Sequence, residues 1–182
     1  MEYEILVRWR AFPLHPETPD EGISLDQLLG PRLDIQEIRS RLAKTAGDLG
    51  LPFRGSDTLY NSRLAQELGL WSETKNRGDA FHAAVFKAYF VDGRNISNVP
   101  ILVELASSVG LSAHEAAEVL AARAFKEAVD SDWELSREKS VTAVPTFILN
   151  QDRLVGAQPY AAFQELMGKN GAKRRVHTSG IS

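Results

Sequence analysis

The sequence predicts a mixed α/β fold in which a long helical block separates an N-terminal strand from a C-terminal strand–strand–helix unit. An opening run is dense in β-branched and aromatic residues, and two short apolar runs near the C-terminus are separated by a hairpin-length turn. Between them, apolar residues recur at helical spacing over roughly 100 residues. A chain of 182 residues with 43% hydrophobic content can form one domain, or a core with one inserted subdomain.

The first predicted element is a strand over residues 3–12, "YEILVRWRAF". Its residues partly alternate, with Tyr3, Ile5, Val7 and Trp9 on one face and Glu4, Leu6, Arg8 and Arg10 on the other. The stretch that follows, "PLHPETPDEG", contains three prolines and one glycine. We expect it to end the strand in an extended loop.

Five helical segments follow in the pattern of apolar residues. They are "DIQEIRSRLAKTAGDLG", "YNSRLAQELGLW", "DAFHAAVFKAYFVDG", "SNVPILVELASSVG" and "SAHEAAEVLAARAFKEAV", the last continuing to Lys139 with a break near residues 121–123. Ser97 or Asn98 is the expected cap of the fourth segment, with Pro100 in its first turn. Ser112 and Glu115 have the spacing of a capping box in the fifth.

The C-terminal elements are a hairpin and a helix. "TFIL" and "RLVG" are predicted strands joined by the turn-forming "NQD", and "PYAAFQELMGKNG" is a predicted helix with Pro159 at its start. The remaining residues, "AKRRVHTSGIS", are basic and poor in apolar side chains. We expect this tail to be solvated.

The composition argues against several classes of site. The chain has no cysteine, so it can hold no disulfide, thiolate nucleophile or cysteine-ligated zinc. None of its four histidines has another histidine four residues away, as a helical HExxH site requires. The net charge of -3 does not favour nucleic-acid binding, and no apolar run approaches the roughly 20 residues of a membrane span. We therefore expect no metal, no cofactor, no nucleic-acid partner and no membrane association.

The start of the chain lacks the basic region and apolar core of a signal peptide, which predicts a cytoplasmic protein.

A few isolated residues remain as candidates for ligand binding. Arg10 and His15 are candidates for an anion site, although a solvated arginine and a loop histidine are the simpler interpretations. Trp9, Phe12, Phe53 and Tyr60 are candidates for an apolar pocket, although aromatic residues at such positions more often belong to a core.

The most specific local motif is residues 143–147, "AVPTF", where a proline precedes an apolar run. Because proline cannot donate to a ladder, we expect Pro145 at the entry to a strand. Taken alone, the motif favours a trans Val144–Pro145 bond, since only about 5–6% of such bonds in folded proteins are cis.

Five segments in the same order resemble the DsbA-like thioredoxin-fold family, and they cover nearly the whole chain. They are "VRWRAFPLHPETPDEG", "NSRLAQELGLW", "FKAYFVDGRNISNVPILVELASSVGL", "VTAVPTFILN" and "LVGAQPYAAFQELM". The FrnE-type disulfide oxidoreductases are the most similar branch, and the glutathione-using hydroxychromene-carboxylate isomerases are related. The resemblance implies a thioredoxin-like fold with an inserted all-helical subdomain, which matches the order of elements inferred above.

The resemblance implies a cis Val144–Pro145 loop whose backbone pairs with an extended peptide or glutathione. The implied substrate-binding residues are Val144, Pro145 and Thr146, although a purely structural role for Pro145 is the interpretation that the residues themselves favour. Ser140 and Ala143 stand where the family often has glycine. Family members begin with a strand and a helix carrying Cys-x-x-Cys, or serine in the isomerases, so the fold is expected to be N-terminally truncated and no catalytic residue is carried over.

The expected segments are residues 1–30 for the first thioredoxin-like strand and loop, 31–139 for the helical insertion, 140–170 for the hairpin and last helix, and 171–182 for the basic tail. In this family the first strand lies between the second strand and the hairpin. Its absence allows three arrangements: residues 3–12 pair directly with the hairpin, another chain supplies a strand, or the sequence is part of a longer product. We expect a homo-oligomer formed through the incomplete sheet.

These observations favour a member of the DsbA/FrnE-type thiol–disulfide oxidoreductase family that is redox-incompetent as a cysteine-free chain. Whether it is an enzyme stays open. The alternatives are a glutathione-dependent isomerase or transferase relative, and a non-enzymatic peptide-binding or assembly module. An extended peptide or thiol substrate at the proline loop is the expected partner.

Overall fold

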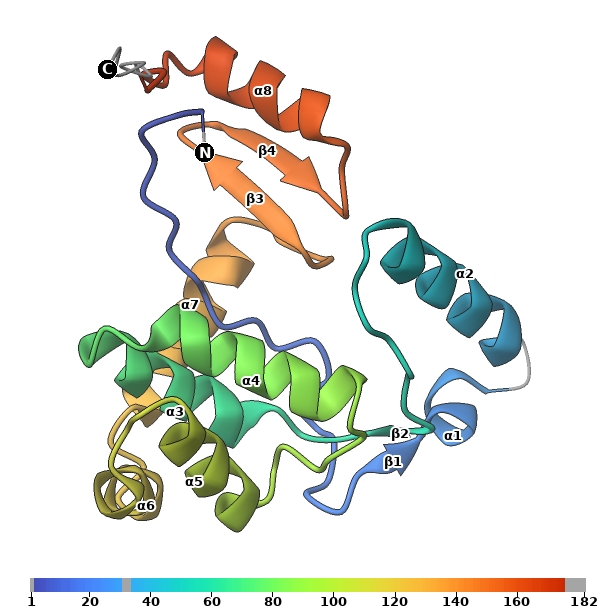
Figure 1. The fold of residues 1–182 in the computed structure, drawn as a ribbon, viewed down its shortest axis with the longest axis vertical. Helices are drawn as coiled ribbons and strands as arrows, with labels where there is room; N and C mark the ends of the chain where they lie inside the picture. Colours follow the sequence, from blue (N-terminus) through green and yellow to red (C-terminus); the bar gives the residue numbers. More distant parts are fainter. Residues whose placement is uncertain (1, 31–33, 176–182) are drawn as a thin grey trace, which may run out of the picture. The chain divides into compact units, whose positions relative to one another are not determined.

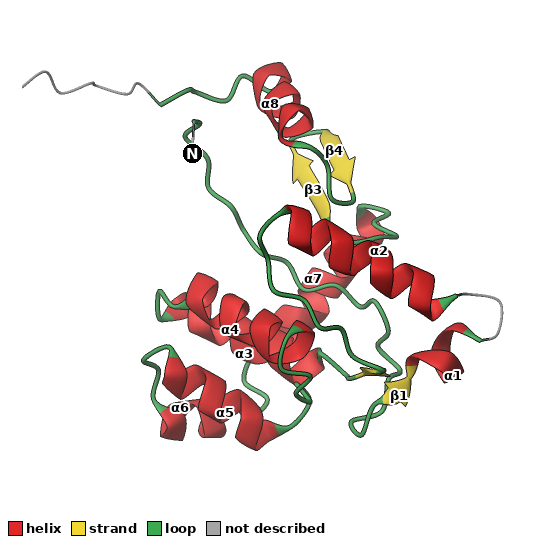
Figure 2. Ribbon diagram, turned by 45° about the vertical axis from the view of Figure 1, so that its right-hand side comes forward, coloured by secondary structure: helices red, strands yellow, loops and turns green. Residues whose placement is uncertain are grey.

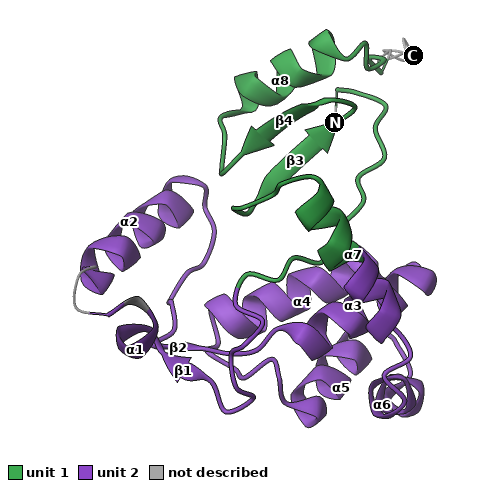
Figure 3. Cartoon of the chain, turned by 180° about the vertical axis from the view of Figure 1, so that it is seen from behind, with its two compact units in different colours: residues 1–14, 132–182 green, residues 15–131 purple. Residues whose placement is uncertain are grey.

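The computed structural model describes residues 2–30 and 34–175 of the chain (Figure 1). The chain forms two compact units, each described here by itself (Figure 3). The first unit contains residues 1–14 and 132–182, and the second contains residues 15–131. Helix α7, Lys126–Glu138, crosses the boundary between them. The division of the chain into segments 1–30, 31–139, 140–170 and 171–182 is not tested by these two units and stays a prediction.

The second unit is built mainly from four helices, which confirm the helical segments expected from the sequence. They are α3 (Arg63–Thr74), α4 (Gly78–Phe90), α5 (Val99–Ser108) and α6 (Ala113–Ala121). Their apolar faces form one core, whose fully buried side chains include Leu68, Phe81 and Leu102. Gly69 permits the close approach of α3 and α4, because a Cβ atom there would lie 3.0 Å from Nε2 of His82.

The start of the second unit contains shorter elements. These are β1 (Ile23–Ser24), α1 (Leu25–Leu29), α2 (Ile35–Asp48) and β2 (Thr58–Leu59), with β1 and β2 paired in antiparallel fashion. The sequence predicted α2 but not the two short strands or α1. None of the residues of α2 is buried, and Leu42 is 47% exposed.

The helix caps follow the predicted chemistry with one exception. The side chain of Asn98 accepts a hydrogen bond from the Ile101 N–H at the start of α5, and Ser112 accepts one from Glu115 at the start of α6. The carboxylate of Glu115 forms an ion pair with Lys75 at 2.6 Å instead of completing a capping box. A complete capping box occurs at Ser24, in a helix that the sequence did not predict.

A buried carboxylate joins α3 to the connection between α6 and α7. Glu67 is 1% exposed and accepts hydrogen bonds from Arg63 at 2.7 Å and from Arg123 at 2.8 and 2.7 Å. Arg63 also pairs with Asp130 at 2.7 Å. Arg123 has φ 51°, in the left-handed region, at the predicted break between the two helices. Burial acts to raise the pKa of Glu67, but the hydrogen bonds and charges of Arg123 and Arg63 together outweigh it and hold that pKa below its usual range.

The first unit contains a β-hairpin and the last helix (Figures 1 and 2). β3 (Thr146–Leu149) pairs with β4 (Asp152–Val155) in antiparallel register, with Thr146 opposite Val155 and Leu149 opposite Asp152. Asn150, with φ 55°, begins the two-residue turn. Helix α8, Tyr160–Lys169, follows Pro159 and packs on the hairpin through an edge-to-face contact between Phe147 and Phe163, with ring centroids 4.8 Å apart.

The predicted strand over residues 3–12 is wrong. Tyr3 forms an isolated bridge with Arg174, and the remaining residues of the segment are in no strand. A strand requires a partner along its length, and residues 3–12 do not pair with the hairpin. The segment is anchored at its two ends instead. The Glu4 N–H donates to the Lys173 carbonyl at 2.8 Å, and the Ala11 N–H donates to Oδ2 of Asp132 at 3.0 Å.

The basic tail expected over residues 171–182 lies partly outside the described residues, which end at Arg175. Its described part bonds to the start of the chain, because the Arg175 N–H donates to the Glu2 carbonyl at 2.8 Å. The Arg174 guanidinium lies over the ring of Tyr3, 5.5 Å from its centroid. No helix in residues 2–30 and 34–175 has the length and apolar character needed to cross a membrane.

Candidate functional site

The loop before β3 begins where α7 ends. The Ser140 N–H donates to the Arg137 carbonyl at 2.8 Å, and the Val141 N–H donates to the Ser136 carbonyl at 2.9 Å. Ser140 has φ 50°, which turns the chain out of the helix. Because the left-handed region favours glycine, this conformation is uncommon for a residue that carries a side chain.

The other end of the loop is fixed against the hairpin. The Gly156 N–H donates to the Pro145 carbonyl at 2.8 Å, extending the β3–β4 ladder by one residue. The Thr146 hydroxyl donates to the Ala143 carbonyl at 2.6 Å and closes the loop on itself. The Val144–Pro145 peptide bond is cis. The loop is therefore held by bonds on both sides of Val144.

Val144 itself is the exposed point of this loop. The residue is 44% exposed, and Ala143 and Pro145 beside it are also exposed. In the part of the chain that the structure describes, its backbone N–H and carbonyl make no hydrogen bond. A free donor and acceptor beside an apolar side chain can pair with an extended ligand by main-chain hydrogen bonds.

The three residues predicted to bind substrate are contiguous, but they are not equivalent. Val144 and Pro145 are exposed, whereas Thr146 is half-buried at the start of β3. The Thr146 hydroxyl already donates within the loop. Its contribution to any ligand is therefore through its backbone.

Arg10, a candidate for anion binding, has a different role. Its Nη1 lies 2.8 Å from Oδ1 of Asp132, which is 3% exposed. The neighbouring Ala11 N–H donates to the other carboxylate oxygen of Asp132. The ion pair and this hydrogen bond fix the end of the N-terminal segment. The role of Asp132 was not predicted from the sequence. It is one of several acidic residues in α7, and nothing in the sequence distinguishes it as the buried one.

The second anion candidate, His15, lies beside a carboxylate. Its Nδ1 is 3.8 Å from Oε1 of Glu17, and its carbonyl accepts hydrogen bonds from the N–H and hydroxyl of Thr18. A neighbouring carboxylate opposes the binding of an anion. These contacts indicate a turn rather than a ligand site.

The aromatic pocket candidates are divided between the units. Trp9 and Phe12 belong to the first unit, while Phe53 and Tyr60 belong to the second. Phe53 stacks on Phe90 with ring centroids 6.3 Å apart, and Tyr60 meets the edge of Tyr89 at 6.4 Å. Burial raises the pKa of Tyr89, with a smaller contribution from Tyr60. Phe53 and Tyr60 therefore pack within the second unit.

The titratable side chains of residues 2–30 and 34–175 do not have the spacing of a metal centre. No group of three or more histidine, aspartate or glutamate side chains that could hold a metal ion occurs among the described residues. Burial lowers the pKa of His82, so its imidazole is neutral at neutral pH.

Comparison with known proteins places this geometry in a family. The model of the DSBA-like thioredoxin domain matches residues 2–168. The chain belongs to the DSBA-like thioredoxin family. This confirms the fold that the five sequence segments implied, and the mixed α/β architecture agrees with it.

Individual relatives agree with this assignment. The chain is 26% identical over 175 residues to the uncharacterized protein YwbO of Bacillus subtilis, covering 94% of this chain and 85% of that protein. A probable DsbA oxidoreductase from Streptomyces coelicolor has a similar structure, with a TM-score of 0.81, 26% identity and coverage of 92% and 76% of the two chains. A 2-hydroxychromene-2-carboxylate isomerase shares the fold, with a TM-score of 0.71, 19% identity and coverage of 89% and 79%.

Proposed function

We propose that this chain is a redox-inactive member of the DSBA-like family that docks an extended peptide or thiol substrate on the loop of Val144, Pro145 and Thr146. The observation that carries the proposal is the exposed Val144, whose backbone donor and acceptor have no partner among the described residues. Family membership supports a substrate of the thiol–disulfide class. The similar Streptomyces structure is of a probable DsbA oxidoreductase, which points to the same class.

The absence of cysteine limits the chemistry of the 182-residue chain. Disulfide exchange begins with attack of a thiolate on a disulfide sulfur and passes through a mixed disulfide. This chain has no sulfur atom that can form such a bond, because its only sulfur-containing residues are two methionines. The proposed function is therefore docking without electron transfer.

We expect the 182-residue chain to show no disulfide reductase activity. In an insulin-reduction assay with dithiothreitol, the rate of turbidity increase should equal that of dithiothreitol alone, because the chain supplies no thiolate. An equal concentration of thioredoxin serves as the positive control. A rate above the dithiothreitol background would contradict the redox-inactive assignment.

The docking loop offers only a small main-chain contribution to binding. Two hydrogen bonds to the Val144 backbone contribute about 1–3 kcal/mol in total. Since a dissociation constant of 1 mM already corresponds to about 4 kcal/mol, side-chain contacts must supply the rest. The apolar side chain of Val144 beside the free backbone groups is the first such contact.

Val144→Pro is expected to weaken binding of a short acetylated peptide with a central cysteine by about tenfold, because it removes the backbone donor. Val144→Ala keeps the N–H and should weaken binding by no more than about threefold. Isothermal calorimetry measures both, with circular dichroism to confirm that each variant is folded. Equal affinities for the two variants, or no binding to the unmodified chain, would overturn docking at this loop.

A further inference from the structure

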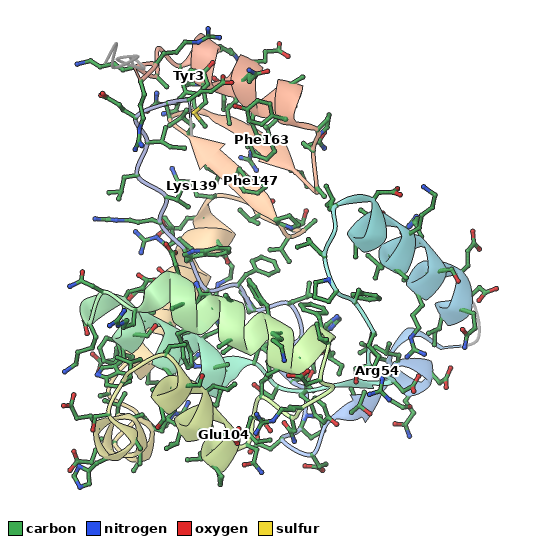
Figure 4. The ribbon with its side chains drawn as sticks, in the orientation of Figure 1. Tyr3, Arg54, Glu104, Lys139, Phe147 and Phe163 are labelled. Atoms are coloured by element: carbon green, nitrogen blue, oxygen red, sulfur yellow. The ribbon has the colours of Figure 1, made fainter. Side chains whose placement is uncertain are left out.

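Helix α8 is attached to the β3–β4 hairpin at two places. Near the start of the helix, Phe163 packs against Phe147 of β3 (Figure 4). At the end of the helix, the side-chain amide of Asn170 bonds to the hairpin turn. Its Oδ1 accepts a hydrogen bond from Nδ2 of Asn150 at 2.9 Å, and its Nδ2 donates to Oδ2 of Asp152 at 2.9 Å. The first attachment is apolar, and the second depends on one amide group.

These three residues, Asn150, Asp152 and Asn170, are called the turn network below. Nδ2 of Asn170 also donates to the Leu166 carbonyl at 3.0 Å. Asp152 forms an ion pair with Lys169, and the hydrogen bonds from Lys169 and Asn170 lower the pKa of its carboxyl group. The Asp152 carboxylate is therefore ionised at neutral pH. An acid in place of the Asn170 amide would have no N–H group to donate and would add a second negative charge beside Asp152.

The residue after Asn170 makes this amide chemically vulnerable. Among the asparagines of the sequence, only Asn170 is followed by glycine. An asparagine side chain is lost as an amide when the backbone nitrogen of the next residue attacks its carbonyl carbon and closes a cyclic imide. Because glycine has no Cβ, Gly171 leaves that nitrogen unobstructed. The pair Asn170–Gly171 therefore has the local chemistry of a spontaneous deamidation site.

The fold holds both groups that would react. The Gly171 N–H donates to the Gly168 carbonyl at 3.1 Å, and Asn170 is the C-cap of α8, with φ -93° and ψ 10°. The side-chain amide of Asn170 is held by its three hydrogen bonds. The attack thus requires the end of α8 to open and release both groups. A reaction that proceeds only from a locally opened state is slowed in proportion to the population of that state.

We propose that Asn170 is a site of spontaneous deamidation that the turn network protects, and that its conversion to an acid releases the end of α8 from the hairpin turn. The Gly171 nitrogen forms a bond to Cγ of Asn170 and gives its proton to solvent. The bond from Cγ to Nδ2 breaks, and ammonia leaves. Water then opens the imide to aspartate or isoaspartate, so the reaction consumes one water molecule and requires no oxidant or cofactor.

The product cannot restore the turn network. A carboxylate at residue 170 lies against the ionised Asp152 and the Leu166 carbonyl, both of which accepted hydrogen bonds from the amide. Like charges at this distance repel, and the two lost donors leave no compensating contact. The attachment through Phe163 and Phe147 remains, so we expect the end of α8 to open while its start stays on the hairpin.

The rate of deamidation tests the site and its protection. The full chain is incubated in mildly alkaline buffer, and mass spectrometry of its digest follows the mass gain of the amide-to-acid conversion at Asn170. Conversion should be at least about tenfold slower than in a synthetic peptide of residues 166–175, and in concentrated urea the two rates should be equal. Equal rates without urea would overturn the protection, and no conversion in urea would overturn the site.

Variants of the turn network test the mechanism of protection. Asn150→Gly removes the hydrogen bond to Asn170 and keeps a residue suited to φ 55°, so conversion should be about fivefold faster. Asp152→Ala removes a different bond to the same amide and should have a similar effect. Glu165→Ala changes an exposed residue of α8 outside the network and should stay within about twofold of the unmodified chain. Equal rates in all three variants would contradict protection by these contacts.

Asn170→Asp tests the structural consequence. Amide hydrogen exchange of residues 170–172 should be about tenfold faster than in the unmodified chain, because the bonds at the end of α8 open more often. Asn170→Ala removes the same bonds without adding charge and should have a smaller effect. The amides of α4, in the second unit, should be unchanged and show that the variant is folded. Exchange equal to that of the unmodified chain would overturn the release of α8. Both measurements omit a peptide ligand, so their failure is distinguishable from failure of docking at Val144.

Discussion

Glu67→Gln is expected to lower the free energy of unfolding by about 3 kcal/mol, because it leaves two arginines around a buried site without their negative partner. Glu67 is 1% exposed and accepts hydrogen bonds from both Arg63 and Arg123. The loss should fall at the lower end of the range for broken buried pairs, because Asp130 still pairs with Arg63. Urea unfolding monitored by circular dichroism measures the change.

Glu104→Gln is the matched control. Glu104 also forms a double contact with an arginine, Arg94, but its side chain is 65% exposed. Exposed ion pairs contribute little because water and salt screen them, so this variant should unfold close to the unmodified chain. Equal losses in the two variants would contradict the importance of burial at Glu67.

The contacts of Glu67 with Arg63 and Arg123 also make the free energy of unfolding depend on pH. Because the pKa of Glu67 is lowered in the folded state, its ionisation stabilises the fold above its ordinary pKa of about 4.3. That contribution is lost as the pH falls through the lower folded-state pKa. The stability difference between the unmodified chain and Glu67→Gln should therefore be full at neutral pH and shrink in acid. A difference that is constant with pH would contradict this account.

Phe81→Ala is expected to lower the free energy of unfolding by about 4 kcal/mol, since it removes a large side chain from a close-packed core. Phe81 is 0% exposed and lies among the buried side chains of the helical unit. Denaturant unfolding followed by tryptophan fluorescence measures the loss, because Trp71 belongs to the same core.

Phe86→Ala, five residues further along α4, provides the control. Phe86 is 47% exposed, so the same atoms are removed from a position that is half in water. We expect a loss of about 1 kcal/mol. A loss as large as that of Phe81→Ala would show that exposure does not determine the cost in this helix.

Local chemistry explains why the helices could be predicted from the sequence. Apolar spacing and caps act within one or two turns, so Asn98 and Ser112 mark the starts of α5 and α6 as expected. The short strands β1 and β2 could not be found in this way. Each has two residues and depends on a partner more than 30 residues away, as in the pair of Ile23 and Leu59.

The error at residues 3–12 has the same origin. Alternation reports which residues suit a half-buried strand, but a strand forms only where another strand supplies hydrogen bonds. In this chain the segment finds partners at Lys173 and Asp132. Neither contact has a sequence pattern, because both join residues that are far apart in the chain.

The candidate site was predictable only in its local part. Val144, Pro145 and Thr146 are adjacent in sequence, and the motif places them at the entry to a strand, where β3 begins. The closure of the loop through Gly156 depends on a tertiary contact. The order from the long helices through the hairpin to the last helix was also predictable, and the family match confirms the fold that it implied.

The uneven distribution of buried side chains has a consequence for tolerance to sequence change. In the described chain, the clustered core lies in the second unit, which contains the helices α3 to α6. The buried apolar residues described in the first unit, which contains the β3–β4 hairpin, are Tyr3 and Leu166. Most core substitutions reduce stability, and a chain tolerates them only while it stays above its threshold for folding. Substitutions in the second unit are therefore the more restricted by stability, and the first unit can vary its surface residues at a lower cost in stability.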